Sequence, residues 1–165
     1  MANSGSADMC DFFHSLLFAY QKSVKEILGP GEAAFMPPIL EKIILVTNKQ
    51  NLGLPEEQNP EELLEDFLEE LLKKGTAKWV ELKEVGEENY LFRVEGCRFS
   101  KHIHGFADTE DTTCPLALAV MAYLQVSTGK KVRPTDSKYT KTGTRTLIEF
   151  LPQQKKKIAA VHASS

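Results

Sequence analysis

Cysteine is scarce in this chain, and no long apolar run occurs. Three cysteines among 165 residues are a poor disulfide framework, so we interpret them as metal ligands, nucleophiles or packing groups. No segment reaches the roughly 18 apolar residues that span a bilayer. The first ten residues lack the basic and apolar regions of a secretory signal. We therefore expect a cytoplasmic protein without a membrane span, in which thiols stay reduced.

The chain also lacks a strong charge of either sign and the glycine-rich motifs of nucleotide enzymes. Its 20 Lys and Arg residues against 23 Asp and Glu residues give a net charge of −3. A nucleic-acid partner is not expected, because phosphate contacts need clustered cations. Neither a phosphate-binding loop nor a Gly-x-Ser-x-Gly elbow is present. Nothing here identifies an enzyme, and we favour a non-catalytic protein.

What is present is a change of hydrophobic period along the chain. Helical spacing predicts three helices in the first half and one later, at residues 10–28, 33–49, 60–74 and 115–128. Two pairs of alternating segments predict two hairpins, formed by residues 77–85 with 90–95 and by residues 131–139 with 144–151. Pro134 favours an edge position for its strand. The expected fold class is α+β, an antiparallel sheet from two hairpins packed with helices.

This pattern also predicts how the chain is organised. Residues 1–58 would form an N-terminal helical segment that packs on the core, residues 59–151 the α+β core, and residues 152–165 a polar tail.

The clearest chemical signal is a group of four soft ligands in the middle of the chain. Cys97, His102, His104 and Cys114 fall within 18 residues in the spacing Cys-x4-His-x-His-x9-Cys. Zinc takes four tetrahedral thiolate and imidazole ligands. On extended backbone, the two histidine rings would point to the same side. Cys114 directly precedes a helix opened by Pro115, where backbone N–H groups favour a thiolate. The sequence therefore predicts a zinc site.

Other interpretations of these residues stay open. The cysteines can be packing groups and the histidines exposed neighbours. Cys10 and His14 share one helix face and can join the cluster. A closed site would be structural, whereas a free coordination position or a Cys-His nucleophilic pair would permit catalysis. The loop acids can orient a histidine, but we favour solvated acids; they are Asp108, Glu110 and Asp111.

Four segments from the helix at Pro60 to the last strand carry a family resemblance: ELLEDFLEELLKKGTAKW, YLFRVEGC, CPLALAVMAYLQVSTGKKV and GTRTLIEF. The region resembles the 4-vinyl-reductase-like, or hydrocarbon-binding, domain family, and the whole chain looks most like its small stand-alone archaeal-type members. The resemblance implies a fold shared with subunits of the transport-protein-particle tethering complex, frequent dimerisation, and an apolar pocket for a small hydrophobic molecule. Some relatives carry zinc.

The chain departs from the family pattern at the cysteine positions. Sensor members of the family place several cysteines in the final hairpin, and here that hairpin has none. The cluster between Cys97 and Cys114 would therefore be a different arrangement.

Three functions follow, in this order of preference. The first is a non-catalytic zinc-containing module that binds a small hydrophobic ligand in a regulatory or sensory role. The second is a homodimeric scaffold with structural zinc, and the third is a zinc enzyme. The residues expected to line the ligand pocket are Phe99, Phe106, Leu118, Met121 and Tyr123.

Overall fold

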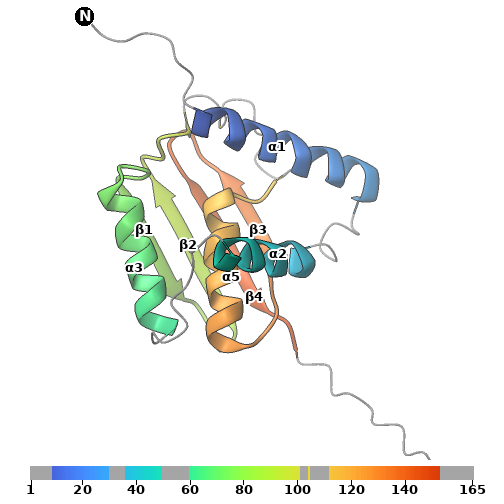
Figure 1. The fold of residues 1–165 in the computed structure, drawn as a ribbon, viewed down its shortest axis with the longest axis vertical. Helices are drawn as coiled ribbons and strands as arrows, with labels where there is room; N and C mark the ends of the chain where they lie inside the picture. The colour runs from blue at the N-terminus through green and yellow to red at the C-terminus, as the bar shows by residue number, and fades with distance from the viewer. Residues whose placement is uncertain (1–8, 30–35, 50–59, 101–103, 105–111, 153–165) are drawn as a thin grey trace, which may run out of the picture.

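The computed structural model describes residues 9–29, 36–49, 60–100, 104 and 112–152, and the description below is confined to these ranges. Four helices and four strands follow one another in the order drawn in Figure 1. They are α1 (Met9–Leu28), α2 (Met36–Lys49), α3 (Pro60–Lys73), β1 (Trp79–Glu84), β2 (Asn89–Glu95), α5 (Pro115–Thr128), β3 (Val132–Tyr139) and β4 (Thr144–Phe150).

The strands form one antiparallel sheet in the order β1-β2-β4-β3. Each predicted hairpin is present, and β2 joins β4 to make the two hairpins one sheet. The strand that carries Pro134 lies at an edge, as predicted, and its register shifts between Pro134 and Asp136. A proline has no N–H for a ladder bond, so an edge strand with an irregularity accommodates it. The expected α+β class is confirmed.

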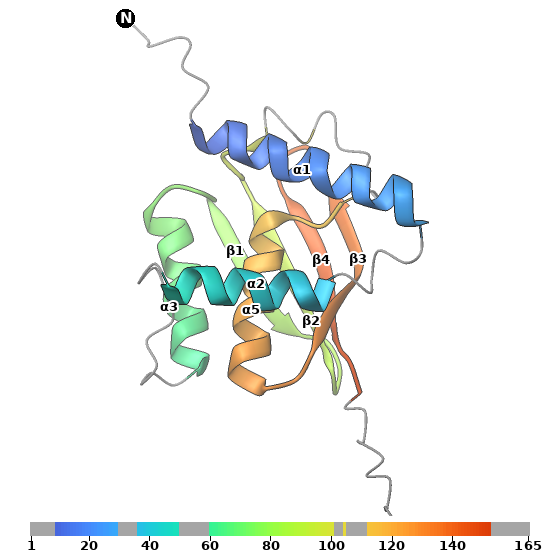
Figure 2. The same cartoon turned by 45° about the vertical axis from the view of Figure 1, so that its right-hand side comes forward.

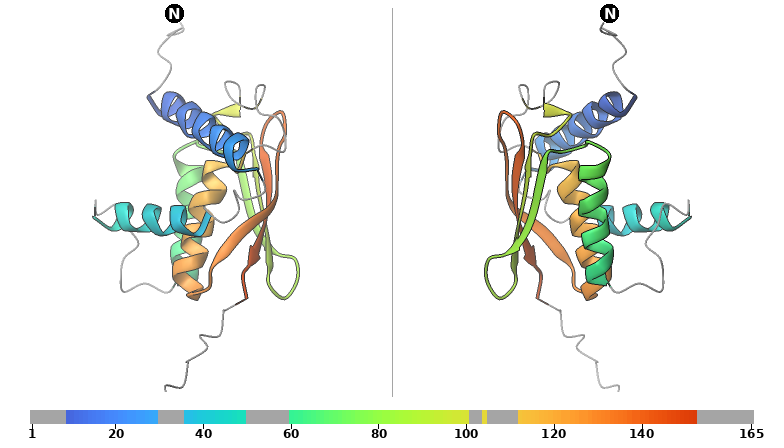
Figure 3. Two further views of the ribbon diagram at one scale, coloured as in Figure 1. Left: turned by 90° about the vertical axis from the view of Figure 1, so that its right-hand side faces the viewer. Right: turned by 90° about the vertical axis from the view of Figure 1, so that its left-hand side faces the viewer.

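The helices cover one face of the sheet, and none of the described helices lies on the other face (Figure 3). Helices α3 and α5 run along the sheet, while α1 and α2 cross them (Figure 2). The nearly all-apolar sequence of α5 predicted burial on several sides, and the helix lies in the middle of this layer. Its buried side chains are Ala117, Leu118, Val120, Met121, Ala122 and Leu124.

The core is continuous between the helices and the sheet. Phe92 and Val94 of β2, Ile148 of β4 and Val120 of α5 are fully buried together. Leu40 of α2, also fully buried, belongs to the same cluster, so α2 packs directly on this core. In the part of the chain that the structure describes, no helix combines the length and apolar character needed to cross a membrane.

Helix α1 lies across the end of the sheet where α5 begins (Figures 1 and 2). Two of its side chains reach inward. The ring of Phe18 meets Tyr139 edge-on at a centroid distance of 6.3 Å. The side-chain Oε1 of Gln21 accepts a hydrogen bond from the backbone N–H of Thr113 at 3.0 Å. These contacts place α1 directly over the region where the predicted ligands gather.

A buried cysteine and histidine cluster as the candidate functional site

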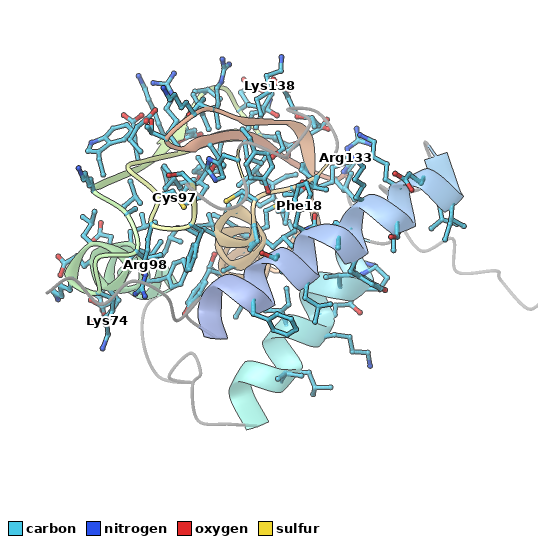
Figure 4. All side chains as sticks on the ribbon, turned by 90° about the horizontal axis from the view of Figure 1, so that it is seen from above. Phe18, Lys74, Cys97, Arg98, Arg133 and Lys138 are labelled. Atoms are coloured by element: carbon cyan, nitrogen blue, oxygen red, sulfur yellow. The ribbon has the colours of Figure 1, made fainter. Side chains whose placement is uncertain are left out.

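Cys97 and Cys114 stand at the two ends of the segment that joins β2 to α5, and both are buried. Cys97 follows Gly96, whose positive φ of 62° turns the chain out of β2. Its backbone N–H donates to the carbonyl oxygen of Thr142 at 2.8 Å. Cys114 is the N-cap residue of α5 and is 1% exposed. Both are free thiols. Figure 4 looks onto this end of the molecule, with Cys97 near the start of α5 and Phe18 reaching in from α1.

Burial keeps both thiols protonated in the absence of a cation. It raises the pKa of Cys97 to about 11, and a charge on Cys114 would raise it further. It also raises the pKa of Cys114, against the opposing effects of the Thr144 hydroxyl and the first backbone N–H groups of α5. The N-terminus of α5 does favour a thiolate at Cys114, as the sequence suggested, but burial outweighs it. A bound cation is the usual way to ionise such thiols.

His104 is buried beside these thiols, with one ring nitrogen bonded and one not. Its Nδ1 lies 2.9 Å from the carbonyl oxygen of Thr140. Because a carbonyl only accepts, Nδ1 carries the hydrogen and Nε2 carries the lone pair. That Nε2 is buried and has no hydrogen-bond partner. Burial also lowers the pKa of His104, which favours the neutral ring. A neutral ring fixed by an Nδ1–H to carbonyl bond is the usual form of a metal-ligating histidine.

The backbone at His104 differs from the extended conformation considered above. Its N–H donates to the carbonyl oxygen of Ser100 at 3.2 Å, four positions back, which is a helical turn. The condition under which the two histidine rings would share a side is therefore not met at His104. His102, the other predicted histidine ligand, lies outside the described residues.

Tyr139 is the common neighbour of the three predicted ligands. Its ring meets the His104 ring at a centroid distance of 4.9 Å and an interplanar angle of 79°. Burial raises its pKa, and charges on Cys114 and Cys97 contribute to the rise. Tyr139 and both cysteines belong to the same buried cluster. The tyrosine thus places His104, Cys97 and Cys114 in one buried region.

Three buried hydroxyls in this region, those of Thr112, Tyr139 and Thr144, make no hydrogen bond of good geometry, although Thr112 lies next to the Tyr139 hydroxyl and Thr144 next to the Cys114 sulfur. Each residue is at most 3% exposed. Buried polar atoms are nearly always satisfied, and a group of exceptions calls for a ligand, ion or water. Sequence reasoning missed these residues. The only signal was positional, since Tyr139 and Thr144 end the predicted strands of one hairpin and Thr112 stands two residues before Cys114.

The β3–β4 hairpin tip supports the cluster. The carbonyl of Thr140 holds His104, and that of Thr142 holds Cys97. The tip is itself closed by the Gly143 N–H, which donates to the Thr140 hydroxyl at 2.9 Å. A Cβ on Gly143 would overlap the carbonyl oxygen of Val94 in β2. Glycine at this position therefore allows the tip to approach β2 and the segment that carries Cys97.

No group of three or more Cys, His, Asp or Glu side chains forms a ready metal geometry within the described ranges. The structure brings three of the four predicted ligands to one region without arranging them as a coordination sphere. The loop acids Asp108, Glu110 and Asp111 lie outside those ranges. Cys10 and His14 belong to α1, and the placement of their side chains is likewise outside the description.

The residues predicted to line a ligand pocket are divided between two places. Leu118 and Met121 belong to the main core, and Phe99 packs partly buried against it. Tyr123 stacks on Phe67 of α3, with ring centroids 4.7 Å apart. Phe106 lies outside the described residues.

Comparison with known proteins gives no relative. No family model, no curated protein and no solved structure matches this chain.

Proposed function

We propose that this chain is a non-catalytic regulatory module built around a zinc ion held by Cys97, His104 and Cys114, with His102 as the fourth ligand. The observation that carries the proposal is the buried, unpartnered Nε2 of His104 beside two buried thiols. A mixed set of sulfur and nitrogen ligands favours zinc over the other common metals. Four protein ligands would close the site, and a closed site is structural rather than catalytic.

The surroundings of the cluster support this assignment. Zinc would ionise the two thiols that burial otherwise keeps neutral, and the unpartnered hydroxyls could then donate to the thiolates. One ion would therefore satisfy the lone pair of His104 and give acceptors to Tyr139 and Thr144. In its absence these buried groups remain a cost to folding of roughly 1–3 kcal/mol each.

The proposal includes a small hydrophobic ligand and the family resemblance. Phe99 lies two residues after Cys97 and Leu118 lies on the first turn of α5, so both would form the wall nearest the zinc. The resemblance to the 4-vinyl-reductase-like family and to the transport-protein-particle subunit fold is supported by the order of elements, two hairpins separated by a buried helix. A cytoplasmic location accords with free thiols. The test is a panel of hydrophobic and aromatic compounds. A rise in melting temperature with some of them would support binding of a small hydrophobic ligand, and no rise with any of them would reject it.

Metal analysis tests the zinc. Protein purified without added metal should contain about one zinc per chain, and Cys97→Ser with Cys114→Ser should lose it together with thermal resistance. Cys10→Ser is the comparison, because Cys10 is not in the proposed ligand set and its loss should leave the zinc content unchanged. Wild-type protein without zinc, or a double variant that keeps it, would reject the proposal.

A second candidate function, a homodimeric scaffold, rests on the outer face of α1. Four large apolar side chains are mostly exposed there: Phe12 at 57%, Leu16 at 53%, Tyr20 at 60% and Ile27 at 80%. At about 100° per residue they lie within one quarter of the helix circumference, away from the inward-facing Phe18. A monomer rarely exposes such a stripe.

A second copy of the chain is the occupant that fits this stripe best. The four side chains expose on the order of 400–500 Å² per copy. A stable interface buries about 800 Å² per partner. Two α1 helices packed about a two-fold axis would cover the stripe on both copies, and neighbouring elements would supply the rest of the interface.

A further inference from the structure

On the face of the sheet away from the helices, one cross-strand row begins at Glu81 of β1, and its other three members are cations. Arg93 of β2 and Arg145 of β4 are direct cross-strand partners, and Lys138 of β3 is the partner of Arg145 on its other side. All three residues are exposed. Side chains that are directly opposite in an antiparallel sheet point to the same face. Figure 4 shows Lys138 on the side of the sheet away from the helices.

This row works against stability of the fold. Like charges directly opposite each other on a sheet are destabilising. A row two steps along the same face shows the stabilising alternative, because Arg133 of β3 faces Glu149 of β4 there, with Nη2 and Nε at 2.7 and 2.9 Å from one carboxylate oxygen. The same sheet thus pairs opposite charges in one row and aligns three like charges in another.

The cations of the row are only weakly compensated. The nearest carboxylate oxygens lie 3.8 Å from Arg93, on Glu81, and 3.6 Å from Lys138, on Asp136. Both distances exceed ordinary hydrogen-bond lengths. Among the residues that the structure describes, no carboxylate pairs with Arg145 in the middle of the row. A local conflict of this kind, with no gain to the fold, marks a surface that serves binding.

We infer that this row, which we call the cationic row, is a docking surface for an acidic helix of a partner protein. Strands in a sheet are about 4.8 Å apart. Carboxylates three or four positions apart on a helix are about 5–6 Å apart. A helix laid across β2, β4 and β3 would therefore present one carboxylate to each cation. Arginine holds carboxylates in two-point hydrogen bonds, which gives such contacts geometry as well as charge.

An aromatic anchor stands beside the row, next to Glu81, which occupies its β1 end. Trp79 lies two positions before Glu81 on β1, so it projects from the same face, and it is 43% exposed. Exposed tryptophan and arginine are the residue types that most often dominate binding energy at interfaces. The partner helix is accordingly expected to carry one large apolar residue beyond its acidic positions.

The test measures binding of a fluorescein-labelled, alanine-rich helical peptide with glutamate at every fourth position and one terminal leucine. At low salt, about one-fifth of physiological ionic strength, wild-type protein should bind this peptide and not its glutamine counterpart. Arg145→Glu should weaken binding at least tenfold. Lys42→Glu is the matched control, since it makes the same charge change on exposed α2, across the molecule from the cationic row.

A second readout separates docking from a structural role. Arg145→Gln should weaken peptide binding while the melting temperature stays level or rises by about 1–3 °C, because the substitution relieves repulsion between like charges. Absence of peptide binding by wild type, equal binding by Arg145→Glu, or tighter binding of a single-stranded oligonucleotide than of the peptide would overturn the inference.

Discussion

The imidazole of His104 donates its Nδ1 hydrogen to the carbonyl oxygen of Thr140 at 2.9 Å, across a separation of 36 positions. This bond joins the helical turn after β2 to the tip of the β3–β4 hairpin. Cys97 is joined to the same tip through Thr142. Two of the proposed ligands are thus positioned by the backbone of a third segment, and the site depends on that hairpin as much as on the ligands themselves.

Alkaline pH should destabilise the metal-free protein through Cys97. An unfolded chain ionises this thiol near pH 8.5, whereas the folded chain holds its pKa at about 11 because of burial. Below pH 8.5 the thiol is protonated in both states and costs nothing. Between pH 8.5 and 11 only the unfolded chain ionises, so the free energy of unfolding should fall by about 2 kcal/mol. Urea denaturation at pH 7.5 and 10.5, after chelation, measures the loss.

Cys97→Ala removes the titrating group and should show a smaller loss over the same pH interval. Comparing the two proteins subtracts the titration of the lysines, the tyrosines and the remaining cysteines, because both proteins contain them. Identical pH dependence in both would contradict burial of this thiol.

Substitution of Gly143 should be the most damaging change at any glycine of the described fold. An alanine Cβ would overlap the Val94 carbonyl oxygen, so the hairpin tip would have to move away from β2. We expect Gly143→Ala to cost about 3 kcal/mol or more. Gly129→Ala is the comparison, because Gly129 has φ of 64° but open space around it, and should cost only about 1 kcal/mol. Equal costs in chemical denaturation would show that the tip can retreat freely.

The sequence predicted the elements well because their signals are local. Alternation and turn residues defined both hairpins, and Pro134 indicated the edge strand. The pairing of β2 with β4 was not predictable, because nothing in either strand encodes a partner that distant. The described part of α2 begins at Met36, next to Pro37 and Pro38, which suit the first turn of a helix.

The candidate site was predicted only through its soft ligands. Cys97, His104 and Cys114 stood out because their side chains have distinctive chemistry at close spacing. Tyr139 and Thr144 did not, since threonine and tyrosine are ordinary strand residues. Their role comes from burial beside the thiols, which depends on how α1 and the hairpin tip close over the start of α5.

Charge on the outer face of α1 should abolish dimerisation without unfolding the chain. Leu16→Glu with Ile27→Glu places two carboxylates in the proposed two-fold interface, while both positions remain exposed in the monomer. Light scattering should show a dimer for the wild-type protein and a monomer for the variant, with unchanged far-ultraviolet circular dichroism. Val85→Glu, an equally apolar-to-charged change at a 44% exposed position outside α1, should leave the dimer intact. A monomeric wild-type protein would reject the proposed homodimer.

Thr144→Val should weaken zinc retention although threonine 144 is no ligand. Its buried hydroxyl lies against the Cys114 sulfur and favours the ionised form, although no other group bonds to it. Valine keeps the shape and removes that donor, and loss of such an outer hydrogen bond typically costs 10–100-fold in metal affinity. Competition with a chromogenic chelator measures the change. Thr146→Val is the matched control, because Thr146 is equally buried but its hydroxyl bonds to Ser137 at 2.9 Å. Weaker zinc binding in Thr144→Val alone would support a Cys114 thiolate that accepts a hydrogen bond from Thr144. Equal zinc affinities in the two variants would contradict that hydrogen bond.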